Sequence, residues 1–536
     1  NTLSPYFYKV MDYTWDPSDP EFFYLELLQK GTDYIKQGTI NRYSDRTFYF
    51  DARVNYNRRF GEDHTVSGML MYMQREYRSD VLPQRNQGLS GRFTYDYQNK
   101  YFAEFNFGYN GTERLASGHR FEFFPAMSLG WAVSNESFWE PLSTAVTHFK
   151  IRGSYGLVGS DETGLLAGAA HFLYINNVNI DGSGIFSTGP YDGVYISKKG
   201  PGIEGYAVEN ASWERAKKFD IGVDLNLFDQ VSITFDYFHD RRDRILQKRG
   251  SWPVIMGYAH ATPWSNIGKV DNKGFELSVN WKKEIIKDMF VDLRGNFTYT
   301  QNKYVYNDEP DYPYVWQTKT GKPLSCTYGY IADGLFEDED DIRNSPSQKN
   351  LGSTVMPGDI KYRDVNGDGA ITTEDQVMLS RYGGIPRIQY GFGLNWTYKN
   401  IDFGVFFNGS AQRTLMIDNI APFCSDVGNQ DRNLMKFIAD NYWSEASPNP
   451  EAAYPRLGVN NSQVANNMKP SSFWMRNGNF LRFKTLELGY SFSFCRIYLS
   501  GDNLAVWSPF KLWDPELSYS AYPLQRAINI GAQFTF

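Results

Sequence analysis

The segment from Asp364 to Asp375 carries oxygen-bearing side chains at the spacing of a calcium-binding loop. Asp364, Asn366 and Asp368 stand at loop positions 1, 3 and 5, and a glycine at position 6 permits the sharp turn that such loops require. Ala370 would offer its backbone carbonyl at position 7, and Asp375 stands at position 12, where the longer glutamate is usual. The pattern predicts a structural Ca2+ site that stiffens a loop. The alternative is a turn in which the same side chains bond to their own backbone.

Other candidate residues fit several roles. The acidic run 337–341 would attract cations or basic peptides, or it would form a solvated loop face or the acidic first turn of a short helix. Loop aromatics would stack on sugar rings or peptide side chains, pack the loops together, or meet a partner protein. They are Trp252, Trp264, Tyr312, Tyr314, Trp316, Tyr328 and Tyr330. No substrate-binding residue is assigned from these patterns.

Sequence patterns of catalysis are missing. The six histidines are scattered without metal-ligand spacing, and the chain has no G-x-S-x-G elbow, P-loop or H-E-x-x-H motif. The sequence therefore predicts a protein that is not an enzyme. Cys326 and Cys424 both fall in predicted loops, and either a disulfide between them or two unpaired thiols fits the sequence.

The composition indicates which scaffold holds these loops. The chain has 536 residues and a net charge of −7, and 17% of its residues are aromatic. No run of 18 apolar residues occurs, and three cysteines are too few for a disulfide framework, so helical membrane proteins and disulfide-rich domains are excluded. Many aromatics in an otherwise polar chain are typical of outer-membrane β-barrels, which carry aromatic girdles around a polar lumen, although a large soluble β-protein has a similar composition.

Alternation of apolar and polar residues predicts the strands. In 101–109 the odd positions hold apolar or aromatic residues and form one face of the strand. Glu104 and Asn106 lie on the other face. The same period of two predicts about 15 strands in an all-β, antiparallel fold. They are placed at 47–60, 64–76, 89–97, 101–109, 125–134, 147–157, 216–227, 231–241, 273–281, 289–303, 387–398, 400–411, 478–494, 495–506 and 526–536.

The connections between these strands alternate in length. Short ones fall at 60–63, 98–100, 135–146, 228–230, 282–288, 399 and 494–495, whereas those at 77–88, 110–124, 158–215, 242–272, 304–386, 412–477 and 507–525 are long. Short turns at one rim and long extracellular loops at the other predict a transmembrane antiparallel β-barrel. A closed bacterial barrel has an even number of strands. We therefore interpret 1–536 as the C-terminal part of a barrel whose first strands and plug lie outside this chain. The junction at 494–495 is so tight that residues are expected to be missing there.

Several segments, in their order and spacing, resemble SusC/RagA-like TonB-dependent transporters over nearly the whole chain. They are RFTYDY (92–97), FPA (124–126), LGW (129–131), ESFW (136–139), IRGSYG (151–156), NKGFEL (272–277), PGDIKY (357–362), FLRFKTL (480–486), DNL (502–504) and IGAQFTF (530–536). The terminal Phe536 resembles the aromatic signal that barrel-assembly machinery recognises, and it also fits an aromatic residue packing at the membrane interface.

The resemblance implies a multi-pass barrel in the outer membrane of Bacteroidetes, with 22 strands in the full protein and a plugged lumen. It further implies import of oligosaccharides or oligopeptides, driven by TonB through a missing N-terminal part. A SusD-like surface lipoprotein would be the partner, in a dimer of transporter–lipoprotein pairs. Two other functions compete with this one: an enzyme on the barrel rim, which needs a nucleophile and base not found here, and a soluble, calcium-stabilised glycan-binding protein.

Overall fold

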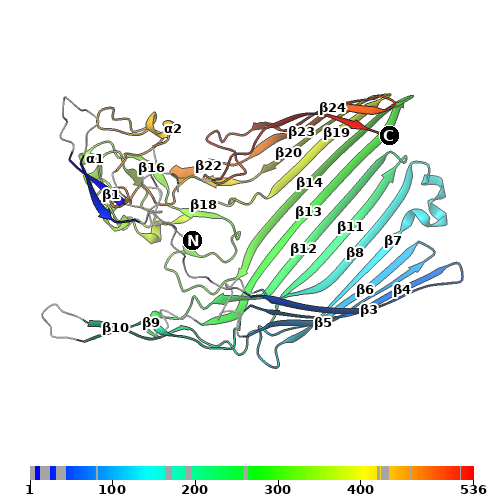
Figure 1. Cartoon of the computed structure of the whole chain (residues 1–536), viewed down its shortest axis with the longest axis horizontal. Coiled ribbons are helices and arrows are strands. Elements are labelled where there is room, and N and C mark those ends of the chain that lie inside the picture. The colour runs from blue at the N-terminus through cyan, green and yellow to red at the C-terminus, as the bar shows by residue number, and fades with distance from the viewer. Residues whose placement is uncertain are drawn as a thin grey trace. The chain divides into compact units, whose positions relative to one another are not determined.

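The computed structural model describes residues 7–12, 24–31, 44–79, 82–162, 172–188, 196–256, 263–418, 420, 423, 434–458, 461–519 and 521–535. The chain divides into two units. The smaller comprises Asn1–Phe50 and Arg75–Arg85, and it contains the antiparallel pair β1 (Phe7–Asp12) and β2 (Tyr24–Gln29). The larger comprises Asp51–Gln74 and Asn86–Phe536 and contains most of the strands and all the candidate residues (Figure 1).

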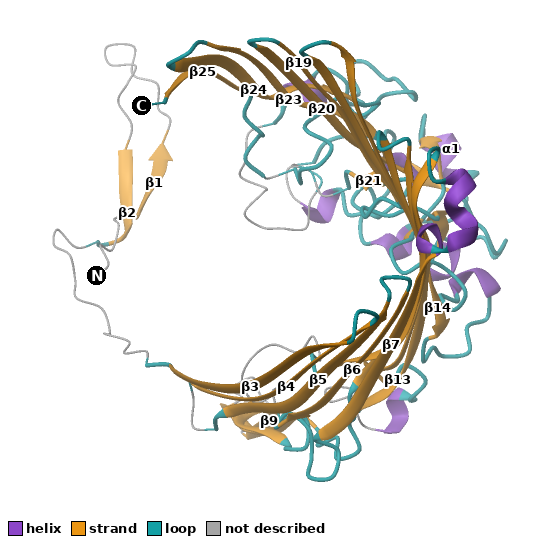
Figure 2. Ribbon diagram, turned by 90° about the vertical axis from the view of Figure 1, so that its right-hand side faces the viewer, coloured by secondary structure: helices purple, strands orange, loops and turns teal. Residues whose placement is uncertain are grey.

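The main feature is a sheet of 15 strands in the order β25-β24-β23-β20-β19-β14-β13-β12-β11-β8-β7-β6-β5-β4-β3. Its strands are β3 (Arg46–Phe60), β4 (His64–Arg78), β5 (Gln84–Tyr97), β6 (Tyr101–Thr112), β7 (Phe121–Ala132), β8 (Val146–Ser160), β11 (Glu214–Leu227), β12 (Val231–Lys248), β13 (Trp264–Ile286), β14 (Met289–Tyr306), β19 (Ile388–Tyr398), β20 (Ile401–Ala411), β23 (Phe480–Ser491), β24 (Cys495–Trp507) and β25 (Ala527–Phe534). Each corresponds to a predicted strand, so the all-β prediction is confirmed. Within the larger unit the strands from β5 to β25 follow one another along a curved wall (Figure 2).

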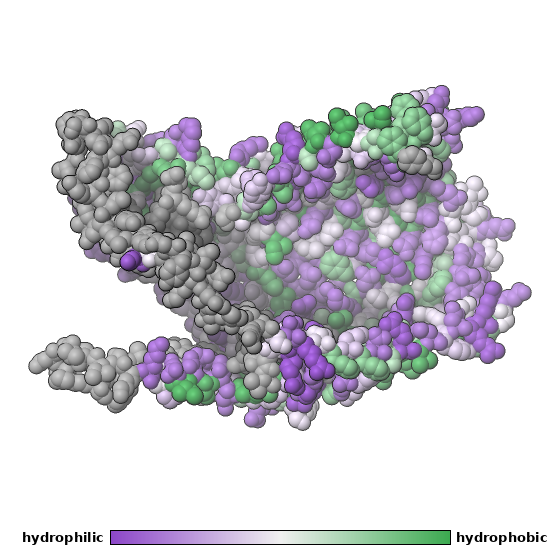
Figure 3. Space-filling view, viewed as in Figure 1, coloured by the Kyte–Doolittle hydropathy of each residue, from purple (hydrophilic) through white to green (hydrophobic). Residues whose placement is uncertain are grey.

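The two faces of this sheet differ as the alternation predicted. On β6, Tyr101, Phe105 and Tyr109 are 46%, 41% and 46% exposed, although each is a large aromatic residue. A soluble sandwich would bury such a face, whereas a membrane barrel turns it toward lipid. The opposite face is the inner side of the curved wall, where hydrophilic residues predominate (Figure 3).

Tight turns join the strands at one end of the sheet. Gln98 and Asn99 between β5 and β6, and Phe228 and Asp229 between β11 and β12, all have φ between +53° and +55°. Two successive residues with positive φ form the hairpin turn whose twist matches that of the flanking strands. The prediction of an unusually tight junction at 494–495 is wrong, because β23 already ends at Ser491 and β24 begins at Cys495. Residues 492–494 therefore form an ordinary turn, in which the Phe492 N–H donates to the Cys495 carbonyl at 2.7 Å.

The long connections at the other end contain structure that the alternation did not predict. The hairpin of β9 (Asn177–Thr188) and β10 (Ile196–Gly205) lies in the connection between β8 and β11. Short elements fill the connections after β14 and β20: β15 (Thr327–Gly329), β16 (Ala332–Leu335), α1 (Glu339–Arg343), β17 (Ile360–Tyr362), β18 (Val377–Ser380), β21 (Thr414–Met416), α2 (Lys436–Ala439) and β22 (Met475–Asn477). Among the described helices, none is long and apolar enough to cross a membrane.

A hydrophobic core lies in these connections rather than in the sheet. Its buried members come from three connections, those after β14, β20 and β24. They are Tyr330, Leu335, Leu351, Ile360, Tyr362, Ile371, Ile417, Ile420, Phe423, Ile438, Trp443, Ala452, Tyr454, Trp474 and Phe510. We call this cluster the loop core. Because segments far apart in the sequence share it, these connections form one packed body instead of separate loops.

Candidate functional site

The predicted calcium loop is a compact turn in which the side chains bond to the backbone. Asp364 accepts hydrogen bonds from the N–H groups of Gly367 at 2.7 Å and Gly369 at 2.8 Å. Both glycines have positive φ, of 78° and 84°. Asn366 accepts from the Asp368 N–H at 3.1 Å, and Asp368 accepts from the Ala370 N–H at 2.8 Å. Three of the predicted ligand side chains, those of Asp364, Asn366 and Asp368, therefore bond to the backbone of their own turn.

Asp375, the predicted ligand at position 12, is fully buried. It accepts from the N–H groups of Val365 and Thr372, both at 2.8 Å. Within the described ranges, no group of three or more His, Cys, Asp or Glu side chains is arranged to hold a metal ion. A carboxylate oxygen has a second lone pair, however, so a backbone hydrogen bond does not prevent it from binding a cation. Calcium binding by this loop stays a prediction.

The loop is bonded to neighbouring segments on both sides. The Ser347 N–H donates to the Gly369 carbonyl at 2.9 Å, and the Ile371 N–H donates back to the Ser347 carbonyl at 2.8 Å. Ile371 is itself a fully buried member of the loop core. On the other side, the indole N–H of Trp316 donates to the Glu374 carbonyl at 2.7 Å. Protein contacts therefore hold the segment on both of its sides.

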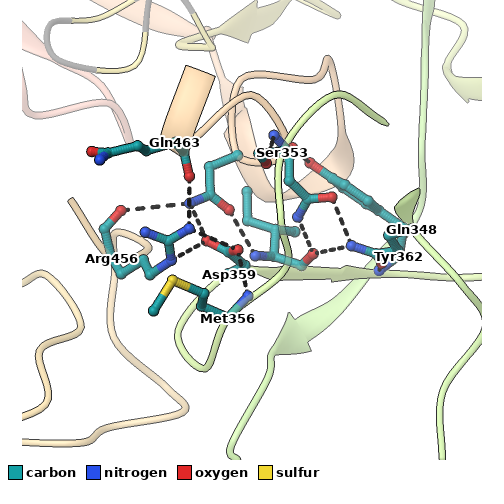
Figure 4. A network of polar contacts seen from close by, with 10 residues as sticks. Gln348, Ser353, Met356, Asp359, Tyr362, Arg456 and Gln463 are labelled. Carbon is teal, nitrogen blue, oxygen red and sulfur yellow. Dashed lines mark hydrogen bonds and ion pairs between the residues drawn. The ribbon is translucent and has the colours of Figure 1, made fainter. Parts of the chain in front are cut away.

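A buried polar network joins two connections beside the loop core (Figure 4). Asp359 is fully buried, and its Oδ1 lies 2.7 Å from Nε of Arg456, more than 90 residues away. The same carboxylate accepts from the Met356 N–H at 2.9 Å and from Asn467 Nδ2 at 2.8 Å. Buried charges persist in proteins where they are paired and hydrogen-bonded, as Asp359 is.

Three buried side-chain amides, those of Gln348, Asn466 and Asn467, complete this network. Gln348 Nε2 donates to the Ile360 carbonyl at 2.9 Å and to Asn466 Oδ1 at 2.8 Å, and Gln348 Oε1 accepts from the Tyr362 N–H at 2.7 Å. Asn467 Oδ1 accepts from the Ile360 N–H at 2.8 Å. The network thus replaces the regular strand pairing that β17 lacks on this side. Sequence analysis missed it because isolated Gln and Asn residues in loops carry no periodic signal.

A second buried ion pair holds the connection after β24 against the sheet. The Arg482 side chain on β23 is 1% exposed. Its Nη2 donates to both Asp514 oxygens, at 2.7 and 2.8 Å, and its Nε donates to Glu516 Oε2 at 2.9 Å. Charge-assisted hydrogen bonds of this kind are stronger than those between neutral groups. Arg482 is the arginine of the FLRFKTL segment, and its contacts account for an arginine at that position.

The loop aromatics occupy different environments. Tyr330 is buried in the loop core and 2% exposed, so it packs the loops together. Trp316 stacks on Tyr314 with ring centroids 4.6 Å apart. The Arg249 guanidinium lies 5.9 Å from the ring centroid of Trp252. The Lys248 ammonium lies 5.6 Å from the ring centroid of Trp264. Tyr312 is 39% exposed.

Three further predictions concern the acidic run, the cysteines and Phe536. Asp338 caps the N-terminus of α1 by accepting from the Asp341 N–H at 2.8 Å, so the acidic run forms the first turn of a short helix, as one alternative predicted. Cys326 is half-buried, and burial raises the pKa of its thiol. Cys424 and Phe536 lie outside the described residues, so the disulfide and the C-terminal signal are not tested.

The inner wall of the sheet carries its own charge network. Arg152 on β8 lies 3.1 Å from Asp224 and 3.5 Å from Asp220 on β11, and 2.6 Å from Asp236 on β12. Beside it is a shallow cavity of about 410 Å³ lined mainly by inward-facing polar residues, Arg152 and Asp220 among them. In this cavity the Lys150 Nζ lies over the Phe102 ring, 4.2 Å from its centroid. The wall therefore presents fixed charges of both signs to whatever occupies the lumen.

A larger cavity, of about 870 Å³, lies in the connection after β14. We call it the loop cavity. Its lining contains apolar residues, among them Phe336, Ile342 and Val355. It also contains hydroxyl groups and two cationic side chains: Ser345, Ser347, Ser353, Thr354, Ser462, Arg343 and Lys349. Such groups can donate and accept hydrogen bonds with a polar ligand.

Comparison with known proteins identifies the family. The family model described as "TonB dependent receptor-like, beta-barrel" matches residues 4–504. TonB-dependent receptor P3 of Formosa agariphila is 26% identical over 83% of this chain and 43% of its own length. TonB-dependent receptor SusC of Bacteroides thetaiotaomicron is 24% identical over 83% of this chain and 43% of its own length. The chain spans about half the length of the curated relatives it matches.

A solved structure has the same fold. The RagAB peptide importer in its open-open state superposes with a TM-score of 0.67 at 17% identity, over 92% of this chain and 55% of that one. The family match, these relatives and the lipid-compatible outer face of the sheet agree. The chain belongs to the β-barrel family of TonB-dependent receptors, which are proteins of the bacterial outer membrane.

Proposed function

We propose that the chain is the barrel portion of an outer-membrane importer of oligomeric nutrients, energised by TonB. The observation that carries the proposal is the family membership over residues 4–504, together with relatives named as receptors and as a peptide importer. These proteins are named as receptors or importers and not as enzymes, which supports a role in transport rather than catalysis. In this proposal the plug and the TonB-contacting segment belong to a longer protein.

The partner in this proposal is a SusD-like surface lipoprotein, in a dimer of transporter–lipoprotein pairs. The support is the resemblance to SusC/RagA-like transporters and the packed body formed around the loop core. A partner that closes over a ligand needs a rigid surface to close against. The buried Asp359–Arg456 and Arg482–Asp514 pairs provide that rigidity, because each ties a loop to a distant segment.

The ligand is an oligosaccharide or an oligopeptide, and the loop cavity is our candidate for a first contact with it. Its hydroxyl groups and two cationic side chains suit the hydroxyls of a sugar and the carbonyls of a peptide backbone equally well. The inner wall beside Arg152 continues this polar character toward the lumen. We therefore propose that a captured polymer moves from the loop cavity to a lumen lined by fixed charges.

Uptake by living cells tests the proposal. A strain lacking the gene, the complemented strain and a strain carrying Thr354→Trp to fill the loop cavity would each be given labelled oligosaccharides and oligopeptides. We expect uptake of one of the two classes to be lost in the deletion and restored by the complement. If the complemented protein is folded in the outer membrane and uptake of every oligomer is the same in all strains, the importer proposal is wrong.

Extraction of the native complex tests the partner. Outer membranes would be solubilised in mild detergent, and the protein isolated and weighed by mass spectrometry. We expect a polypeptide much longer than 536 residues and a co-purifying lipoprotein. A chain of this length isolated alone would contradict both the missing plug and the lipoprotein partner.

A further inference from the structure

The outer face of β11–β14 changes character sharply near the ends from which the long connections leave. These four strands lie side by side in the middle of Figure 1, and the register of their pairing aligns the outward residues into rows. Four rows, read from β11 to β14, are apolar: Leu227, Val231, Trp281, Leu293; Leu225, Ile233, Val279, Gly295; Val223, Phe235, Leu277, Phe297; and Ile221, Tyr237, Phe275, Tyr299. This is the side expected to face lipid.

In the next two rows seven of the eight residues are polar, and four of them are Lys or Arg. The first comprises Phe219, His239, Lys273 and Gln301, and the second Lys217, Arg241, Asp271 and Lys303. We call Lys217, Arg241, Lys273 and Lys303 the outer cationic patch. Residues opposite or diagonal to one another on neighbouring strands lie within about 8 Å, so each of these four side chains lies near the next, and Lys273 and Lys303 are diagonal neighbours.

The patch has more positive charge than its surroundings neutralise. Lys217 lies 3.0 Å from Asp243, and Arg241 lies 3.8 Å from Asp271. Lys273 and Lys303 are exposed, and neither has a carboxylate within ion-pair distance among the described residues. A cation next to an apolar, lipid-facing surface is favoured where it meets an anion at the interface.

The neighbouring strands lack such cations, so the patch is local rather than a ring around the barrel. On β8 the residues in the same two rows are Tyr155 and Leu157. On the other side, β19 begins at Ile388, which lies opposite Tyr299 in the last apolar row. A general interfacial girdle of lysines would continue onto these strands, and it does not.

We propose that the outer cationic patch binds the phosphate groups of a phosphorylated glycolipid in the outer leaflet, such as lipid A. The acyl chains of that lipid would lie against the apolar rows below, and its phosphates would meet Lys273 and Lys303. Continuity between the two surfaces favours a lipid over a protein partner, because one lipid molecule presents both chemistries at the same spacing.

The test compares lipid binding by two matched double variants of the intact protein purified from outer membranes. Lys273→Gln/Lys303→Gln removes two cations from the outer face. Lys218→Gln/Arg242→Gln removes two cations from the inner face of β11 and β12, near the same end. Each delipidated protein would be titrated with lipid A or with dephosphorylated lipid A, and the bound lipid counted by native mass spectrometry.

We expect the outer variant to bind lipid A about 25-fold more weakly, since each cation contributes roughly fivefold. The inner variant should bind as the unmodified protein does, and dephosphorylated lipid A should bind weakly to all three. Lys273→Arg/Lys303→Arg keeps the charges and should restore binding, which separates lost charge from a damaged fold. Equal binding by the outer variant, equal loss in the inner variant, or equal binding of dephosphorylated lipid A would each overturn the proposal. The proposal would also be overturned if the outer variant lost a bound protein while it retained lipid A.

Discussion

Breaking the Asp359–Arg456 pair should loosen the loop core without opening the barrel. In Asp359→Ala, Arg456 is left only 12% exposed and without its carboxylate, and the donors on Met356 and Asn467 lose their acceptor. Removal of one partner from a buried ion pair costs about 3–5 kcal/mol. That free energy corresponds to a rise of roughly 10²- to 5 × 10³-fold in the local opening equilibrium.

Hydrogen exchange measured by mass spectrometry provides the assay. Peptides that cover Ile360 and Asn467 should lose protection by that factor in Asp359→Ala, whereas peptides from β12 and β13 should not change. Arg363→Ala is the matched control, because its ion pair with Asp333 lies on the exposed surface of the same connection. An exposed pair contributes about 1 kcal/mol at most, so this control should change protection less than tenfold.

A double-mutant cycle then isolates the pair itself. Arg456→Met keeps the apolar stem of the side chain and removes its charge. If the two residues interact as described, the double variant should be less destabilised than the sum of the two single variants. The reasoning is refuted if Asp359→Ala alters protection no more than Arg363→Ala does, or if the two single effects are additive.

Three further predictions concern other loop contacts. Burial raises the pKa of Asp308, but hydrogen bonds from Arg249 and Ser251 outweigh this effect and hold the pKa below its usual range. The stability that the Asp308 carboxylate contributes is therefore present above the unfolded pKa of about 3.9 and is lost as the pH falls below that value. Protection of the Ser251 amide, corrected for intrinsic exchange, should therefore fall in acid, and Asp308→Asn should abolish this pH dependence. Arg482→Met should weaken the attachment of the connection after β24 by about 1.5–3 kcal/mol, seen as faster proteolysis within 508–526, whereas unchanged cleavage would mean that the ion pairs do not hold it. If the 364–375 loop binds calcium, a chelator should lower the thermal unfolding midpoint of the unmodified protein, measured by tryptophan fluorescence, but not that of Asp368→Ala. Equal midpoints of the unmodified protein with and without chelator would contradict calcium binding and leave only the backbone-bonded turn.

The strands could be predicted from the sequence, because each must present one face to lipid and the other to a polar lumen. On β13, for example, Phe275, Leu277 and Val279 alternate with Glu276 and Ser278, and this alternation cannot shift by one residue without exchanging the faces. The ends of strands were harder to predict. β13 begins at Trp264, nine residues before the predicted start, because its first part leaves the apolar band and loses the strict alternation.

The loop core could not be predicted in the same way. Ile360 and Trp474 are both fully buried, yet each lies in a segment without helical or strand period. Their burial depends on contacts between connections more than 100 residues apart, and a single sequence gives no sign of which distant segments meet. For the same reason the partners of Arg482 in the FLRFKTL segment could not be predicted, because only the fold brings Asp514 and Glu516 to it.

The shared loop core also limits how such a protein can change over generations. Loops that fold separately can be lengthened, shortened or exchanged one at a time, and selection can adjust each to a new ligand. Here Ile360, Trp474 and Phe510 come from three different connections and are buried in the same cluster. A change in one connection therefore has to be compensated in the others, so the three are inherited as a single block. A chimera intended to transfer specificity should exchange all three connections together.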